Sequence, residues 1–99
     1  MVNANSRVTN SNWCLVERSI GRVIIVYLRR GGTASINLSG LGSSTSSMSV
    51  HWYDPRNGGA LQTGSVTTIR YSNTAEPLGN APTNVQADWV VLLQCSSGC

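Results

Sequence analysis

The chain has no lysine, no phenylalanine and a single histidine, and charged residues of both signs are few. Only 11% of its 99 residues are charged, and just four of these are acids. Its seven cationic side chains are all arginines, with no obvious cluster beyond Arg29 and Arg30. Nucleic-acid-binding domains usually carry a denser basic stripe along one face. The composition therefore argues against nucleic acid as a partner.

Long hydrophobic runs are absent as well. No apolar run approaches the roughly 20 residues that a membrane-spanning helix needs. The longest run, at residues 23–28, has the length and the β-branched composition of a strand. The sequence also shows no export signal at its start. Because Ser, Thr, Asn and Gly replace charge as the source of solubility, as in many extracellular β-domains, we expect part of a larger secreted protein with no membrane partner.

Residues that carry catalysis or bind metals are scarce. The four acids, Glu17, Asp54, Glu76 and Asp88, each have a structural use at a turn, in a loop or at a strand end. Most glycosidases need two carboxylates that flank the bond they cleave, and no such pair is placed by the sequence. One histidine without a Cys-x-x-Cys pair gives no set of metal ligands. We therefore predict a domain that is not an enzyme, with no catalytic residue, no metal and no cofactor.

The three cysteines are an odd number, so at least one of them has no partner within the chain. Cys95 and Cys99 flank a Ser-Ser-Gly segment and could close a small disulfide ring. Cys14 would then be a small buried apolar residue in a strand. The alternative is a bridge between Cys14 and Cys95 that ties the first strand to the last. The sequence leaves this pairing open.

The pattern of apolar residues predicts the fold class. Helical periodicity is nearly absent, and short apolar segments recur between Gly, Ser, Asn and Pro. This predicts an all-β fold, a β-sandwich of two antiparallel sheets with about seven to eight strands around one core. The predicted strands are residues 12–17, 22–28, 33–38, 48–53, 60–63, 65–70 and 88–94.

The same pattern divides the chain into a module and two short ends. Residues 12–94 form the predicted β-sandwich module. Residues 1–11 are a tail or an edge strand, and residues 95–99 are a cysteine-containing tail. Within the module, residues 39–47 read as a low-complexity loop. Residues 71–87 contain Pro77 and Pro82 and read as irregular structure.

An aromatic strand followed by a specified turn is the most informative segment. From Met48 to Tyr53 the residues alternate with period 2, so Trp52 shares an apolar face with Met48 and Val50. His51 and Tyr53 then point the other way. The following turn has Asp54 as an acceptor for backbone N–H groups, then Pro55, Asn57, Gly58 and Gly59. His51 and Tyr53 become candidates for contact with a ligand.

Aromatic side chains carry the main functional signal, because the apolar C–H faces of sugar rings stack on flat rings. Trp52 and Trp89 are predicted to be core residues, whereas Trp13 could point either way. The remaining aromatic residues and their polar neighbours form the predicted carbohydrate-binding site. Its members are Tyr53, His51, Tyr27 and Trp13 as contact residues, with Arg56 and Gln62 as polar partners.

Several of these motifs together resemble a known family, the "putative collagen-binding domain of a collagenase". The resemblance covers roughly residues 12–94 and is most specific in the Trp-Tyr-Asp-Pro-Arg turn and the terminal Asp-Trp-Val segment. The segments that carry it are residues 13–15, 26–28, 31–33, 36–40, 51–65 and 88–93. Members of this family are attached to secreted proteins whose catalytic part is similar to a glycoside-hydrolase barrel. The resemblance implies an all-β sandwich of two antiparallel sheets.

A domain attached to a sugar-cleaving barrel is most simply explained as a carbohydrate-binding module. We therefore expect a secreted, non-catalytic module of a glycoside hydrolase. Its partners would be the linked catalytic domain and a β-linked plant cell-wall glucan, such as cellulose, or a related polysaccharide. The alternatives are a collagen-binding or other protein-binding domain, and an architectural domain that packs on a catalytic barrel.

Overall fold

The computed structural model describes residues 2–3, 5, 8, 13–16, 23–29, 34–38, 47–70, 74–83 and 87–97. Within these ranges the chain forms eight strands and no α-helix, which confirms the all-β prediction. It follows that no helix in this part of the chain is long and apolar enough to cross a membrane.

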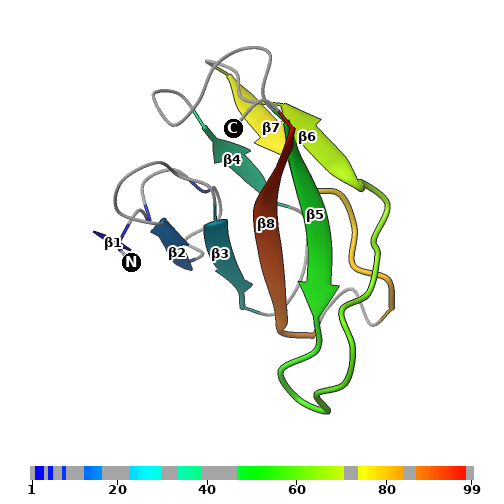
Figure 1. Ribbon diagram of the computed structural model, residues 1–99. Helices are drawn as coiled ribbons and strands as arrows, with labels where there is room; N and C mark the ends of the chain where they lie inside the picture. Colours follow the sequence, from blue (N-terminus) through cyan, green and yellow to red (C-terminus); the bar gives the residue numbers. More distant parts are fainter. Residues whose placement is uncertain are drawn as a thin grey trace.

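The strands form two antiparallel sheets (Figure 1). The larger sheet has six strands in the order β1-β2-β3-β8-β5-β6, and the smaller sheet pairs β4 with β7. Every pair of neighbouring strands is antiparallel. The bounds of the strands are β1 Val2–Asn3, β2 Trp13–Val16, β3 Val23–Leu28, β4 Ser35–Asn37, β5 Ser47–Tyr53, β6 Thr68–Arg70, β7 Ala75–Pro77 and β8 Trp89–Ser97.

Alternate residues of the larger sheet point into the core, because successive side chains of a strand point to opposite faces. The side chains on the inner face are buried, and they meet Ile36, Leu38 and Leu78 from β4 and the segments next to the smaller sheet. The opposite, outer face of the larger sheet carries the other half of each strand. The inner-face residues of the central strands are Ile24, Val26, Leu28, Met48, Val50, Trp52, Trp89, Val91 and Leu93.

Two tryptophans lie at the centre of this core. Trp52 of β5 and Trp89 of β8 are both 0% exposed, which confirms their prediction as core residues. Their rings meet edge to face, with centroids 6.0 Å apart and an interplanar angle of 80°, a favourable geometry for aromatic pairs. Gly64 approaches so closely that a Cβ there would overlap the Trp52 indole nitrogen and the Asn80 carbonyl. A residue without a side chain is therefore required at position 64.

The strand prediction was wrong in four places after residue 59. Residues 60–63 form no strand; Gln62 makes only an isolated bridge to Trp52, because the chain bends on either side of it, at Ala60 and Ser65. The next strand is shorter than predicted and covers only Thr68–Arg70. Ala75–Pro77 is a strand although it contains a proline, because Pro77 is its last residue and pairs at the edge with Ser35.

The last strand also runs beyond its predicted end at Gln94 and reaches Ser97. It does so because β5 continues to pair with it, as far as Ser47 opposite Ser97, after an irregularity in register. Most of the predicted loop at residues 39–47 lies outside the described residues.

The alternative disulfide between Cys14 and Cys95 is wrong. Cys14 is fully buried and takes part in no disulfide. The register places it level with Val91 of β8, two strands away and four residues from Cys95. Cys95 is disulfide-bonded and packs partly against the core. The proposed partner of Cys95 in the small ring, Cys99, lies outside the described residues.

Truncation of Trp52 tests how much the tryptophan pair contributes to the stability of the fold. Trp52→Ala removes a fully buried aromatic side chain, so we expect the free energy of unfolding to fall by roughly 3–5 kcal/mol. Denaturant unfolding followed by circular dichroism measures this loss. As a control, Leu61→Ala changes a side chain that is 46% exposed, and its effect should stay within about 0.5 kcal/mol. Equal effects of the two substitutions would contradict a central role for Trp52.

Candidate functional site

The outer face of the larger sheet brings together residues from four neighbouring strands. Trp13 of β2 pairs with Tyr27 of β3, Tyr27 pairs with Val90 of β8, and Val90 pairs with Tyr53 of β5. Residues directly opposite one another on antiparallel strands point to the same face. We call these four residues the aromatic row. It runs across the strands and contains three of the six aromatic residues of the chain.

A second row, the aliphatic row, lies beside the first. It consists of the aliphatic residues Leu15, Ile25 and Leu92 and, at its β5 end, of His51. These residues pair in the same strand order. Leu15 is 42% exposed, and the other three are partly exposed. The Nδ1 atom of His51 is buried and has no hydrogen-bond partner among the described residues. The two rows together give the outer face an apolar surface of the kind that marks interaction sites.

A pocket of about 610 Å³ lies at the β2 and β3 end of the two rows. Trp13 and Tyr27 belong to its lining, together with Leu15, Ile25 and Asn5. The two rings have centroids 6.2 Å apart and are tilted by 38°, and Trp13 is 62% exposed. Asn5 is held in place because its Oδ1 atom accepts a hydrogen bond of 2.8 Å from the backbone N–H of Cys14. The volume is within the usual range of ligand pockets.

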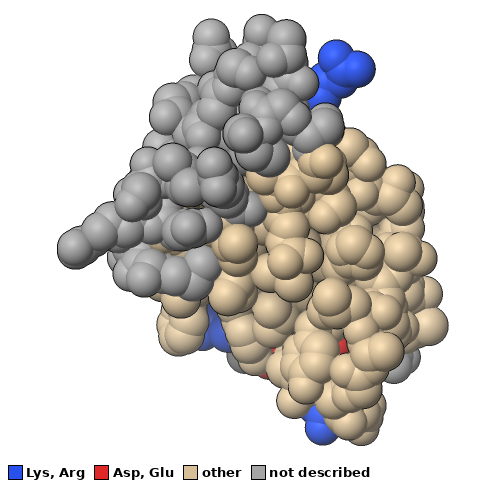
Figure 2. Space-filling view, viewed as in Figure 1, with Lys and Arg blue, Asp and Glu red and all other residues tan. Residues whose placement is uncertain are grey.

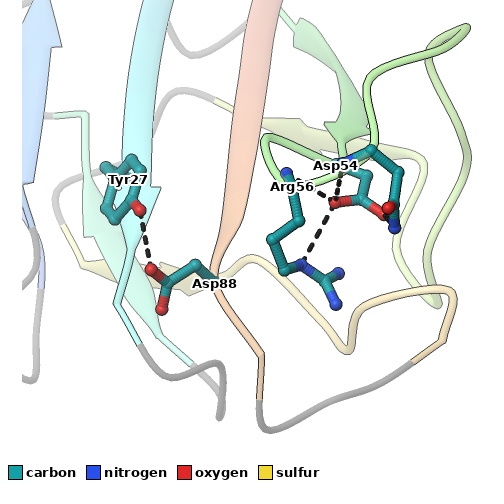
Figure 3. A network of polar contacts seen from close by, with 5 residues as sticks. Tyr27, Asp54, Arg56 and Asp88 are labelled. Carbon is teal, nitrogen blue, oxygen red and sulfur yellow. Dashed lines mark hydrogen bonds and ion pairs between the residues drawn. The ribbon is translucent and has the colours of Figure 1, made fainter.

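The orientation of the Tyr27 ring is fixed by Asp88, which precedes β8. The Tyr27 hydroxyl donates a hydrogen bond of 2.7 Å to Oδ2 of Asp88, as Figure 3 shows. This hydrogen bond raises the pKa of Tyr27, and partial desolvation and the negative charge of Asp88 raise it further. Tyr27 therefore stays protonated above the ordinary tyrosine range and keeps its contact with Asp88.

The other end of the aromatic row meets the turn that follows β5. The Tyr53 hydroxyl lies 3.4 Å from the point where a Cβ on Gly58 would stand. Gly58 has a φ of 72°, a backbone conformation that favours glycine. The turn therefore folds back beside Tyr53 at this end of the row.

Asp54 organises that turn. Its Oδ1 atom accepts backbone hydrogen bonds from Arg56 (2.9 Å) and Asn57 (3.3 Å), and its Oδ2 atom accepts one from the Asn57 side chain (3.0 Å). Burial favours a higher pKa for Asp54, but these hydrogen bonds and the positive charge of Arg56 outweigh it and lower the pKa. The carboxylate form thus holds the turn together, as the sequence pattern predicted.

Arg56 and Gln62 were predicted to be polar partners of a ligand. In the structure each of them contacts other residues of the chain. The Arg56 Nε atom is 3.1 Å from Oδ1 of Asp54 (Figure 3), and its guanidinium carbon lies 5.2 Å from the centroid of the Trp89 ring. Gln62 bridges to Trp52 through two backbone hydrogen bonds of 2.7 Å. Since Trp52 and Trp89 belong to the inner face, the structure does not bring Arg56 and Gln62 to the aromatic row.

The four predicted contact residues do share the outer face. His51 and Tyr53 point away from the core as the alternation predicted, and the structure decides the orientation of Trp13, which points outward. Tyr27 does not neighbour β5, because β8 lies between β3 and β5. This surface also contains four residues that were not predicted for the site: Val90, Leu92, Ile25 and Leu15. The period-2 alternation in β2, β3 and β8 indicates that these residues point outward. It shows that they share one surface only once the strand order is known.

Few charged side chains lie on the face of the molecule that Figure 2 shows. In Figure 2, which has the view of Figure 1, the cationic side chains stand at the margins, and the rest of the described surface is uncharged apart from small acidic areas. The described residues contain no group of three or more His, Cys, Asp or Glu side chains that could hold a metal ion. The two rows themselves consist of aromatic rings, aliphatic side chains and the imidazole of His51.

Comparison with known families agrees with the resemblance seen in the sequence. The family model described as "putative collagen-binding domain of a collagenase" matches residues 1–94. The chain belongs to this family. The family is described as a binding domain, which agrees with the prediction that the chain is not itself an enzyme. No curated protein and no solved structure matches the chain.

The lowered pKa of Asp54 has a consequence for stability in acid. An ordinary aspartate titrates near pH 3.9, and the folded value lies below that. The stabilisation from the Asp54 carboxylate is therefore fully present above the unfolded pKa and is lost as the pH falls through the folded pKa. We expect the melting temperature of the wild type to fall more steeply in this acid range than that of Asp54→Asn, which keeps an oxygen acceptor but cannot titrate.

Asn57→Ala provides the matched comparison, because it removes one of the donors that lower the pKa of Asp54. NMR titration of the Asp54 carboxyl carbon should give a higher pKa in this variant than in the wild type. An unchanged Asp54 pKa would show that the Asn57 side chain does not support the turn.

Proposed function

We propose that this domain is a non-catalytic binding module that holds an extended polysaccharide on its outer face. The ligand would be a β-linked glucan of the plant cell wall or a related polymer. The domain would act as part of a secreted protein, beside a covalently linked catalytic domain. By holding the polymer it would raise the concentration of substrate at that catalytic domain.

The main support is the pocket formed by Trp13 and Tyr27. A tryptophan that is 62% exposed leaves a large apolar ring in water, and such a ring next to a second aromatic ring and a pocket marks a site of interaction. Sugar rings fit this chemistry because their C–H faces pack on aromatic rings while their hydroxyls bond to polar neighbours. Tyr53 and His51, on the same face, would extend the contact.

Collagen is the second candidate, and the description of the family favours it. Collagen chains have the polyproline II conformation, and aromatic-lined grooves bind such chains in other domains. The tilt of 38° between Trp13 and Tyr27 makes their site a groove instead of one flat plane, which suits this second ligand class.

A binding panel separates the candidates. Isothermal titration calorimetry with cellohexaose, xylohexaose and a triple-helical collagen peptide compares the two ligand classes under one set of conditions. Binding to the glycans supports the polysaccharide proposal. Binding to the collagen peptide alone would replace it with the second candidate. Failure to bind any of the three would favour a purely architectural domain that packs on its neighbour.

Substitution of Trp13 tests the site itself. Trp13→Ala removes an exposed ring, so we expect the affinity for the bound polymer to fall about tenfold or more while the melting temperature barely changes. Tyr53→Ala should act in the same direction. Leu61→Ala is the control, because Leu61 is also large, apolar and exposed but lies outside the two rows. Equal losses of affinity for Trp13→Ala and Leu61→Ala would place binding elsewhere.

A further inference from the structure

The register of the larger sheet suggests how a ligand lies on the outer face. We propose that the bound polysaccharide crosses the strands along the aromatic row, and that Val90 is a contact residue at the middle of its path. This inference rests on the proposed function and adds the direction of the ligand and a contact residue from β8.

The aromatic side chains of the outer face support this direction. Trp13, Tyr27 and Tyr53 come from three different strands but occupy one level of the sheet, because the pairing aligns each of them with its neighbour or with Val90. Strands are about 4.8 Å apart, so the row from Trp13 to Tyr53 spans about 14 Å. A polymer that follows this row meets a ring at each end and at β3.

A ligand that ran along a strand would meet fewer aromatic side chains than a ligand that crosses the strands. From Tyr27 along β3 the next outward residues are Ile25 and then Val23, both aliphatic. Val23 is aligned with Gln94 and Ser49, and the Ser49 hydroxyl donates its hydrogen bond to the Gln94 carbonyl at 3.2 Å. A polymer along β3 would therefore leave the rings after one contact and reach aliphatic and polar side chains.

Both ends of the aromatic row also suit a crossing ligand. At one end Trp13 is strongly exposed and lines the pocket. At the other end the turn lies beside the Tyr53 hydroxyl at Gly58. Val90 lies between Tyr27 and Tyr53 and is partly exposed, so a polymer that reaches both tyrosines must pass over it. The Val90 side chain is smaller than those of the two tyrosines, so it projects less far from the sheet than they do.

Two matched substitutions distinguish the two directions. Val90→Glu and Val23→Glu each place the same charged side chain on the outer face of a central strand. The two positions belong to different levels: Val23 is four residues from Tyr27, which is about 13 Å along the strand. Calorimetry with cellohexaose and with xylohexaose measures affinity, and melting temperatures confirm that each variant folds.

A ligand that crosses the strands requires Val90→Glu to lose about tenfold or more in affinity while Val23→Glu stays within about twofold of the wild type. The reverse pattern would show that the ligand follows β3 and would overturn the proposal. Equal losses, or no loss in either variant, would also overturn it. If the wild type binds neither probe, the proposed function fails, and this inference fails with it.

Val90→Tyr gives an independent test if the glutamate variant does not fold. A tyrosine is well suited to a strand and would fill the gap between Tyr27 and Tyr53 with a third ring. We expect it to bind the same probe about threefold more tightly or better. Unchanged or weaker binding by a folded Val90→Tyr variant would overturn the crossing path.

Discussion

The packing of Trp52 against Trp89 is the interaction on which the other features depend. It joins the inner faces of β5 and β8, and the segments around it take their positions from this pair. Gly64 has no side chain because it approaches Trp52, and Arg56 lies over the ring of Trp89. Since a strand has only two faces, burial of Trp52 and Trp89 also fixes Tyr53 and Val90 on the outer side. The same strand pairing thus determines both which residues form the core and which residues form the candidate site.

The outer face has few polar side chains along its two rows. Its two rows contain aliphatic and aromatic residues on paired strands, and a rigid sheet loses little conformational freedom when a ligand binds. The ring of Tyr27 is further restrained by its hydrogen bond to Asp88. A preformed surface of this kind suits an extended ligand that has apolar faces, because most of the ordering has already taken place during folding. This agrees with membership of a family described as a binding domain.

The sequence predicted the features that depend on local alternation and turn chemistry. The all-β class, the burial of Trp52 and Trp89 and the Asp54 turn follow from period 2 and from the backbone preferences of Asp, Pro and Gly. Features that depend on pairing between distant strands could not be predicted in this way. The separation of Tyr27 from Tyr53 by β8 and the place of Val90 in the aromatic row require the strand order. The strand at Ala75–Pro77 was missed because its partner β4, not its own composition, makes it a strand.

The position of β8 has a consequence for how the domain is made. This strand follows the seven other strands in sequence but lies between β3 and β5 in the larger sheet. Until it emerges from the ribosome, β3 and β5 cannot be joined, and the inner face lacks Trp89, Val91 and Leu93. The sheet therefore closes by contacts between residues far apart in sequence, a topology associated with slow folding. During synthesis, the edges of β3 and β5 that β8 will pair with stay open until β8 arrives, and such unpaired edges promote aggregation.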